Sequence, residues 1–359
     1  MLRAGGRQMK HREAILLGGT VAASPLAAHA HVKWFADYDL TKPLLPIGDV
    51  LTGQFVFFFL ASVVAIYAFY WMDRYLYRRH FLEKVLQRYV ISEPIAEIIM
   101  RAAAFVFFAA LGANGLSGLL GKGFFLTPEL KTDLPWVPWA QLAIALCAVT
   151  RRTLPLIGLG IVVLYIASVH QYGLYHLLDY LILLGVAYYF LASLMPGPGW
   201  LMSRYLVLYA TTGLTLLWAA IEKWGYPSWT FPLLEREPGL LMGMSPVTYM
   251  IVAGFVEFNL TFVMLSSVSL FSRALTLGLM SVFVLAIYKF GAIDAIGHLL
   301  IIAILLVLVL RGPTKGRDFL VIEHSSLWTE AYFMTGLYIL AFVLVFVAYY
   351  GFHFIAYGN

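Results

Sequence analysis

The chain has 359 residues, of which 62% are hydrophobic and only 12% are charged. Soluble domains carry about twice that share of charge, so the composition excludes an ordinary soluble protein. The net charge is +5, and the basic residues flank apolar runs instead of forming one basic face, which excludes a nucleic-acid-binding surface. The single cysteine, Cys147, excludes an internal disulfide, a CxxC pair and a CxxCH haem attachment.

Residues 1–30 have the form of a cleavable signal peptide. A basic leader precedes a short apolar run, and Ala28-His29-Ala30 matches an A-x-A cleavage site. Cleavage would leave His31 at the start of an N-terminal segment, 31–46, in the periplasm. The alternative is an uncleaved first helix, although the apolar run is short for a span and contains Pro25.

Ten apolar runs follow this segment, separated by short polar or basic stretches. Runs of about 20 apolar residues indicate membrane-spanning helices. The sequence therefore predicts an all-α fold, a polytopic transmembrane bundle of about ten helices, with the lipid bilayer as its main partner. The runs are 47–72, 101–120, 137–150, 154–169, 175–194, 204–222, 247–269, 274–290, 295–310 and 330–350.

The distribution of lysine and arginine predicts the orientation in the membrane. With the mature N-terminus outside, the inner segments carry 13 basic residues and the outer segments carry 7. Inner loops of membrane proteins are enriched in lysine and arginine. The bias predicts a multi-pass protein of the bacterial inner membrane, with both termini in the periplasm.

The chain contains a weak internal repeat. The span beginning at Arg101 is similar to the span beginning at Arg204, and the segment from His170 is similar to the segment from Tyr288. The repeat predicts two four-helix units in parallel orientation, unless it reflects chance similarity between apolar runs. The predicted divisions are 47–100 (first transmembrane helix and a basic cytoplasmic segment), 101–198 (a degenerate first unit), 199–312 (the second unit) and 313–359 (a C-terminal helix).

Four ionisable residues of the second unit lie inside apolar runs or at their ends: Glu222, Glu257, Asp294 and His298. Charge at membrane depth costs about 2.5–3.5 kcal/mol per residue on insertion scales and usually marks function. Asp294 and His298 are four residues apart, so they share one helix face, and the carboxylate can orient the imidazole. We expect all four to share a catalytic site in the outer half of the membrane, with Tyr226 and Trp229 as cofactor-binding aromatics.

Two alternatives to catalysis stay open for these residues. The polar side chains would join helices without further function if, for example, a lysine faced Glu257. The aromatic loop 223–246 would form a lid over the acidic site, or an interfacial belt with the same composition. In the first unit, His176 and Asp179 occupy the place of Asp294 and His298, with no acid equivalent to Glu257.

A metal site is a separate hypothesis. If His31 becomes the N-terminus, its amine and imidazole form a chelate suited to Cu(II), and His298 is a second candidate ligand. A histidine placed after the cleavage site by chance is the alternative.

The region from Arg204 to Arg311 resembles the DoxX-like family of bacterial membrane proteins. The resemblance rests on IEKWGYPSW, AGFVEFNLTF and FGAIDAIGHLLII. It implies a four-helix unit and a link to redox chemistry, since some relatives of that family are quinone-linked. The length, the repeat and the HVKWF leader depart from the family pattern.

Four functions therefore remain open. The first is a redox-linked protein that acts on a quinone or a small sulfur substrate, together with a periplasmic or membrane redox partner. The others are copper handling outside the membrane, transport of a small solute or proton, and a scaffold subunit of an envelope enzyme. Quinone and copper are the cofactors considered, and no nucleic acid is expected.

Overall fold

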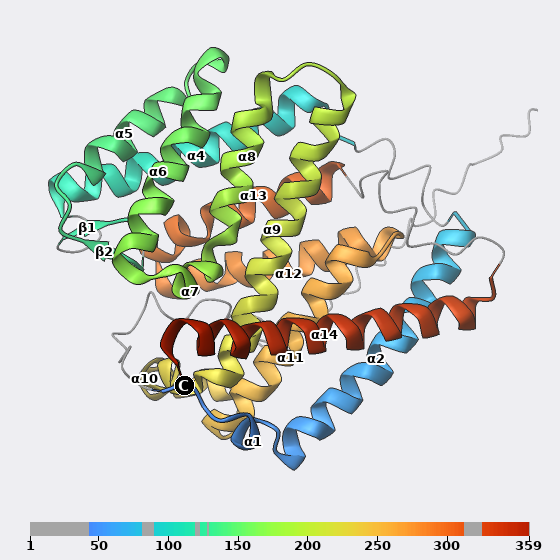
Figure 1. Ribbon diagram of the computed structural model, residues 1–359. Coiled ribbons are helices and arrows are strands. Elements are labelled where there is room, and N and C mark those ends of the chain that lie inside the picture. Colours follow the sequence, from blue (N-terminus) through green and yellow to red (C-terminus); the bar gives the residue numbers. More distant parts are fainter. Residues whose placement is uncertain (1–42, 81–89, 119–122, 128, 312–324, 359) are drawn as a thin grey trace, which may run out of the picture.

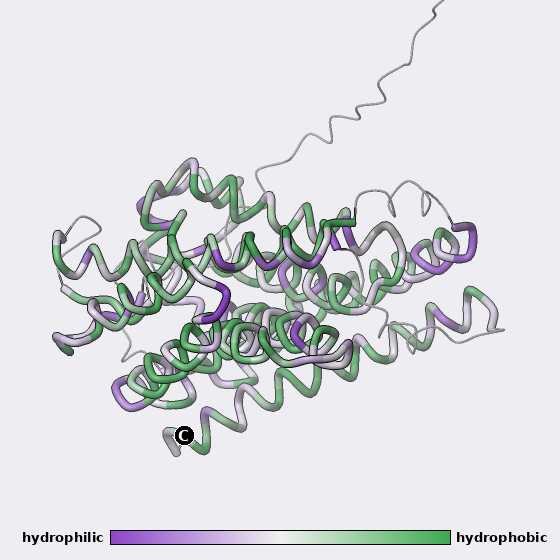
Figure 2. The backbone as a smooth tube through the Cα atoms, turned by 90° about the horizontal axis from the view of Figure 1, so that it is seen from above, coloured by the Kyte–Doolittle hydropathy of each residue, from purple (hydrophilic) through white to green (hydrophobic). Residues whose placement is uncertain are grey.

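The computed structural model describes residues 43–80, 90–118, 123–127, 129–311 and 325–358. Within these residues, eight helices are long and apolar enough to cross a membrane, and two shorter apolar helices accompany them. The prediction of an all-α, multi-pass membrane protein is confirmed. Figure 2 shows hydrophobic residues along most of the length of the helices.

The ten principal helices are joined by short helical turns (Figure 1). Two of the ten have apolar stretches shorter than a full membrane span: Val137–Cys147 in α5 and Ser272–Leu285 in α12. The principal helices are α2 (Gly53–Arg78), α4 (Glu93–Ser117), α5 (Val137–Cys147), α6 (Leu154–Tyr172), α8 (Leu181–Leu191), α9 (Pro198–Gly225), α11 (Pro246–Ser266), α12 (Leu270–Phe290), α13 (Ala292–Arg311) and α14 (Leu327–Tyr357).

Smaller elements lie at the helix ends. The short helices are α1 (Ile47–Val50), α7 (Leu174–Leu177), α10 (Phe231–Arg236), and the 3-10 turns η3 (Arg151–Thr153), η4 (Leu178–Tyr180), η5 (Ala192–Leu194), η6 (Pro227–Trp229) and η7 (Pro238–Leu241). One antiparallel pair of two-residue strands, β1 (Phe124–Phe125) and β2 (Lys131–Thr132), joins α4 to α5.

Local sequence explains where several helices begin and end. Proline occupies the first turn of α4, α5, α6, α9 and α11, where its missing N–H costs no helical hydrogen bond. Ser326 caps α14 by accepting from Thr329 N, and Gly358 ends it in the left-handed region at φ 76°. These caps explain why α14 extends beyond the predicted run 330–350 at both ends.

Eight helices pack in a closed ring. Each helix from α4 to α13 lies against the next long helix in the chain, and α13 packs against α4. The main hydrophobic core crosses the predicted boundary at 198/199: Phe107 and Ile161 belong to the same buried cluster as Leu208 and Ile304. The helix that opens the ring starts at Glu93, before the predicted boundary at 101. The division into two repeated units stays a prediction.

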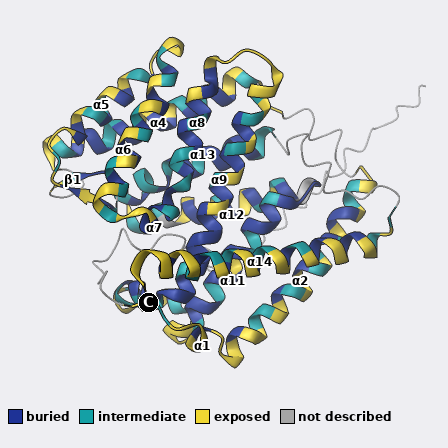
Figure 3. Cartoon of the chain, in the orientation of Figure 1, coloured by how far each residue is buried: buried dark blue, intermediate teal, exposed yellow. Residues whose placement is uncertain are grey.

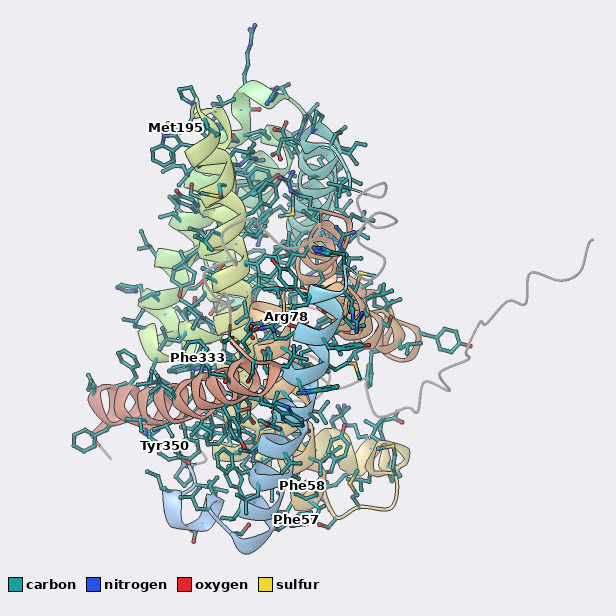
Figure 4. The ribbon with its side chains drawn as sticks, turned by 90° about the vertical axis from the view of Figure 1, so that its right-hand side faces the viewer. Phe57, Phe58, Arg78, Met195, Phe333 and Tyr350 are labelled. Carbon is teal, nitrogen blue, oxygen red and sulfur yellow. The ribbon has the colours of Figure 1, made fainter. Side chains whose placement is uncertain are left out.

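The remaining two principal helices, α2 and α14, pack on each other and on the outside of the ring. Helix α2 contacts α11 and α12, and α14 contacts α9. A second core cluster at these contacts includes Phe55, Phe255 and Phe342. Both helices keep many exposed apolar positions, as Figure 3 shows. In Figure 4, Arg78 lies near the end of α2 opposite to Phe57 and Phe58.

The loop 223–246 was predicted as a lid or an interfacial belt, and its part between α9 and α11, residues 226–245, is folded against the bundle. Leu233, Leu234 and Leu240 from this segment pack with Tyr249 and Met250, at the start of α11. The segment thus forms a cap at the end of the bundle where α9 ends and α11 begins. In the predicted topology this end is the outer one.

Candidate functional site

A buried ion pair joins α9 to α11. The Lys223 ammonium contacts Oε2 of Glu257, and their side chains are only 8% and 7% exposed. Lys223 lies in the last turn of α9, and Glu257 is central in α11. Burial of two charges is costly unless they are paired, so the pair accounts for the presence of Glu257 in an apolar helix.

Close packing of α9 on α11 brings the two charges together. A Cβ added at Gly254 would lie 2.2 Å from Nε1 of Trp224, so only glycine allows this approach. The same indole nitrogen donates a hydrogen bond to the carbonyl of Ile251, at 3.1 Å. Small residues at helix crossings allow such backbone proximity in membranes.

Asp179 of the first predicted unit belongs to the same polar region. Its carboxylate interacts electrostatically with Glu257 and is buried. His176, one turn earlier, is also buried, and its ring contacts Trp229 with centroids 6.4 Å apart. The region between α8, α9 and α11 therefore combines residues from both predicted units.

Glu222 lies at the edge of this region and is half-buried. It interacts electrostatically with Tyr175 and Tyr349. The ring of Tyr175 also contacts that of His353, with centroids 5.3 Å apart. The end of α14 thus covers the side of the region next to Glu222. We refer to Lys223, Glu257, Asp179 and Glu222 as the outer cluster.

Tyr226 and Trp229, the predicted cofactor-binding aromatics, stack on each other. Their ring centroids are 4.0 Å apart and their planes differ by 10°. Both residues are buried. The facing surfaces of the two rings are occupied by this stack, so a planar ligand would contact their outer surfaces or edges.

Asp294 and His298 form a second buried pair. Nδ1 of His298 lies 2.7 Å from Oδ1 of Asp294, and both side chains are almost completely buried. The imidazole packs on Phe283 of α12, with centroids 4.8 Å apart. The predicted pairing on one helix face is present in the structure.

The structure places Glu257 and His298 with different partners. Glu257 bonds to Lys223, whereas His298 pairs with Asp294 on its own helix. The closed ring explains this arrangement. The last helix of the first unit, α8, packs on α9, whereas the last helix of the second unit, α13, packs on α4. Asp179 is thus one acid that interacts electrostatically with Glu257, and the predicted sharing of one site by Glu257 and His298 stays a prediction.

The metal hypothesis finds no ligand group in the described part of the chain. No three His, Cys, Asp or Glu side chains there come together in a way that could hold a metal ion. His31 lies outside the described residues, as does the whole predicted signal peptide. His298 directs one ring nitrogen toward Asp294.

Comparisons with protein-family models, with curated proteins and with solved structures find no match to this chain. The DoxX-like resemblance therefore stays a prediction, and the candidate site has to be judged from its own geometry.

Sequence reasoning missed a buried charge network between α2 and α14. Arg74 lies between two carboxylates, with Nη1 2.9 Å from Asp73 and Nε 2.9 Å from Glu330. Arg78 also pairs with Glu330. A signal was available in the run WMDRY, where an acid and a base adjoin an apolar span. We refer to Asp73, Arg74, Arg78 and Glu330 as the α2–α14 charge network.

This network also fixes the turn between α11 and α12. Asp73 accepts hydrogen bonds from the Ser267 hydroxyl at 2.5 Å and from the Ser269 backbone N–H at 3.2 Å. Glu330 accepts another from the Ser325 hydroxyl at 2.9 Å. Each carboxylate thus has several donors, which is the pattern of a structural joint.

Glu257 of the outer cluster has fewer donors than Asp73. Its Oε1 has no hydrogen-bond partner within the described residues, and its Oε2 is bonded by Lys223. Buried polar atoms are rarely left in this state, and each case needs an explanation. The arrangement can accept a hydrogen bond or a proton from a small molecule at Glu257, beside an ammonium that can donate one.

Proposed function

We propose that this membrane protein binds a small redox-active ring of the quinone type at the outer cluster and exchanges protons with it. The observation that carries the proposal is the buried Lys223–Glu257 pair, with Asp179 within electrostatic range and one Glu257 oxygen open for a further bond. Ionisable groups inside membrane-spanning helices can mark substrate and proton pathways.

Each residue has a distinct role in this proposal. Lys223 donates a hydrogen bond to a carbonyl or phenolate oxygen of the ring, and Glu257 accepts a proton from a hydroxyl of its reduced form. The carboxylates of Asp179 and Glu222 can then take the proton from Glu257 and pass it toward the end of α9. A base of this kind must lie within hydrogen-bond reach of the proton that it takes.

The proposal also includes a redox partner and an orientation of the outer cluster in the membrane. A periplasmic or membrane redox partner would accept or supply the electrons, and the cluster would face the periplasm of a bacterial inner membrane. The support for this orientation is the excess of basic residues on the opposite ends of the helices. The aromatic cap 226–245 would limit access of water to the ring.

The test uses the double variant Lys223→Met/Glu257→Leu in the full-length protein. Replacing a buried ion pair by apolar residues is often neutral or stabilising, so the variant should fold. Equilibrium binding of decylubiquinone to the purified protein should weaken at least about tenfold, equivalent to 1.4 kcal/mol. Glu235→Gln, which neutralises an exposed acid of the cap, should leave binding unchanged.

The single variant Glu257→Gln is less informative, because it leaves the Lys223 ammonium buried without its partner. The double variant separates folding from binding. If it folds and still binds decylubiquinone as the wild type does, the proposed function is wrong.

Proton-coupled transport is a second candidate, favoured by the Asp294–His298 pair. This pair is buried on α13, where His298 lies beside Asp294, whereas Glu257 bonds to Lys223. A transporter uses ionisable groups at more than one place along its path. In proteoliposomes with an enclosed pH dye, transport predicts an acidification that is lost in both His298→Ala and Lys223→Met/Glu257→Leu. Binding without transport predicts no acidification in any of these proteins.

A further inference from the structure

Four arginines gather around two glutamates at the other end of the bundle, where α4 and α9 begin and α13 ends. The glutamates are Glu93 and Glu97, one turn apart on α4. We refer to this group as the inner arginine cluster. Its arginines are Arg101, Arg151, Arg204 and Arg311.

Glu93 joins three helices of the ring. Its carboxylate pairs with Arg311 of α13 and lies 3.4 Å from Nη1 of Arg204 of α9. It also accepts a hydrogen bond from the Tyr205 hydroxyl at 2.8 Å. The guanidinium groups lie over aromatic rings: Arg204 is 4.1 Å from the Tyr189 centroid, and Arg311 is 3.9 Å from that of Tyr205.

The Glu97 carboxylate also contacts two arginines. Nε of Arg151 lies 3.4 Å from its carboxylate, and Nη1 of Arg101 lies 3.8 Å from it. Arg101 is held in place by donating from Nε to the carbonyl of Ala148 at 2.9 Å. These contacts are long for ion pairs, so Glu97 neutralises its two arginines only in part.

The cluster carries more positive than negative charge, because two carboxylates face four guanidinium groups. Nη2 of the buried Arg204 has no hydrogen-bond partner within the described residues. Arg151 is 67% exposed, and Arg101 and Arg311 are 21% and 25% exposed. Arg151, and to a lesser extent Arg101 and Arg311, thus present positive charge at the bundle surface, where an anion could reach it.

We propose that this surface binds the phosphate of an anionic phospholipid headgroup. Arginine pairs with phosphate through two parallel hydrogen bonds, and basic pockets between transmembrane helices on the cytoplasmic side bind anionic headgroups. Next to Arg151, the exposed apolar residues Leu146, Val149 and Leu156 provide a surface for the acyl chains. A free phosphate would gain nothing from these apolar neighbours, so a lipid is the expected source of the phosphate.

The test measures the thermal stability of the full-length protein in a neutral detergent. Added phosphatidylglycerol should raise the midpoint temperature at low salt, whereas phosphatidylcholine with the same chains and inorganic phosphate should not. Native mass spectrometry should detect bound phosphatidylglycerol. In Arg151→Gln/Arg311→Gln, at least half of the rise and most of the bound lipid should be lost.

Two controls separate binding from folding. Arg151→Lys/Arg311→Lys keeps the charge and should retain most of the rise, even if the variant without lipid is less stable. Arg79→Gln removes an exposed arginine outside the cluster and should behave as the wild type. An equal rise with phosphatidylcholine or with inorganic phosphate, or an undiminished rise in the double glutamine variant, would overturn the proposal.

Discussion

The α2–α14 charge network and the outer cluster both bury charge within membrane-spanning helices, but they differ in how the charge is satisfied. In the network, Arg74 pairs with two carboxylates, and Asp73 accepts further hydrogen bonds from Ser267 and Ser269. In the outer cluster, Glu257 has Lys223 as its hydrogen-bonding partner and faces the negative charge of Asp179.

This difference separates a structural role from a functional one. A carboxylate with several donors, such as Asp73, holds one arrangement and has little capacity left with which to bind a ligand. A pair with an open oxygen contributes less to the fold and can form a further bond. Burial of a charged residue is therefore weak evidence of function, and the number of its donors is stronger evidence.

The largest effect is expected for Glu330→Gln, in the α2–α14 charge network. The change leaves Arg74 and Arg78 without the acid that both contact. Breaking a buried pair in this way costs about 3–5 kcal/mol, measured as the free energy of unfolding in mixed detergent micelles. Glu235→Gln is the matched control and should change it by less than about 0.5 kcal/mol. A loss of stability as small as that of the control would contradict the structural role of the network.

A smaller loss is expected for Gly254→Ala, between α9 and α11. The added methyl group would lie 2.2 Å from Trp224 Nε1 and 3.0 Å from the carbonyl of Ala220. Overpacking of this kind costs about 1–3 kcal/mol and separates Lys223 from Glu257. Both stability and decylubiquinone binding should fall, whereas Gly278→Ala, with open space at its Cβ, should affect neither. Retained binding in Gly254→Ala would show that the pair does not form the binding site.

The smallest of the three effects is expected for Asp294→Asn. The amide can still bond His298 within the same helix, so the free energy of unfolding should fall by at most about 1.7 kcal/mol, the largest value for polar contacts between membrane helices. Decylubiquinone binding should be unchanged, because Glu257 bonds to Lys223 and not to this pair. If Asp294→Asn loses decylubiquinone binding but keeps wild-type stability, the Asp294–His298 and Lys223–Glu257 pairs belong to one site, as the sequence predicts.

Apolar runs predicted the helices well because lipid-facing helices must be continuously apolar. The short helix α5 was visible in this way as the run 137–150. The ends were less predictable, since caps such as Ser326 and Gly358 determine them. Polar residues just outside an apolar run, such as those before α14, still belong to its helix.

The partners of the helices could not be predicted from the same pattern. An apolar helix faces lipid or protein with similar residues, so the pattern does not specify its neighbours. The shared site of Glu257 and His298 therefore stays a prediction, whereas the electrostatic interaction of Asp179 with Glu257 was not predicted. The pairing of Asp294 with His298 was predictable because it lies within one helix.

The packing of α13 against α4 has a consequence for biosynthesis. About 190 residues separate the end of α4 from the end of α13, and ribosomes add about 5–20 residues per second. For roughly 10–40 s after α4 has been inserted, Glu93 lacks its partner Arg311 and is accessible to lipid or to insertion factors. A chain truncated before α13 would keep Glu93 without Arg311 permanently and would become a substrate for membrane proteases.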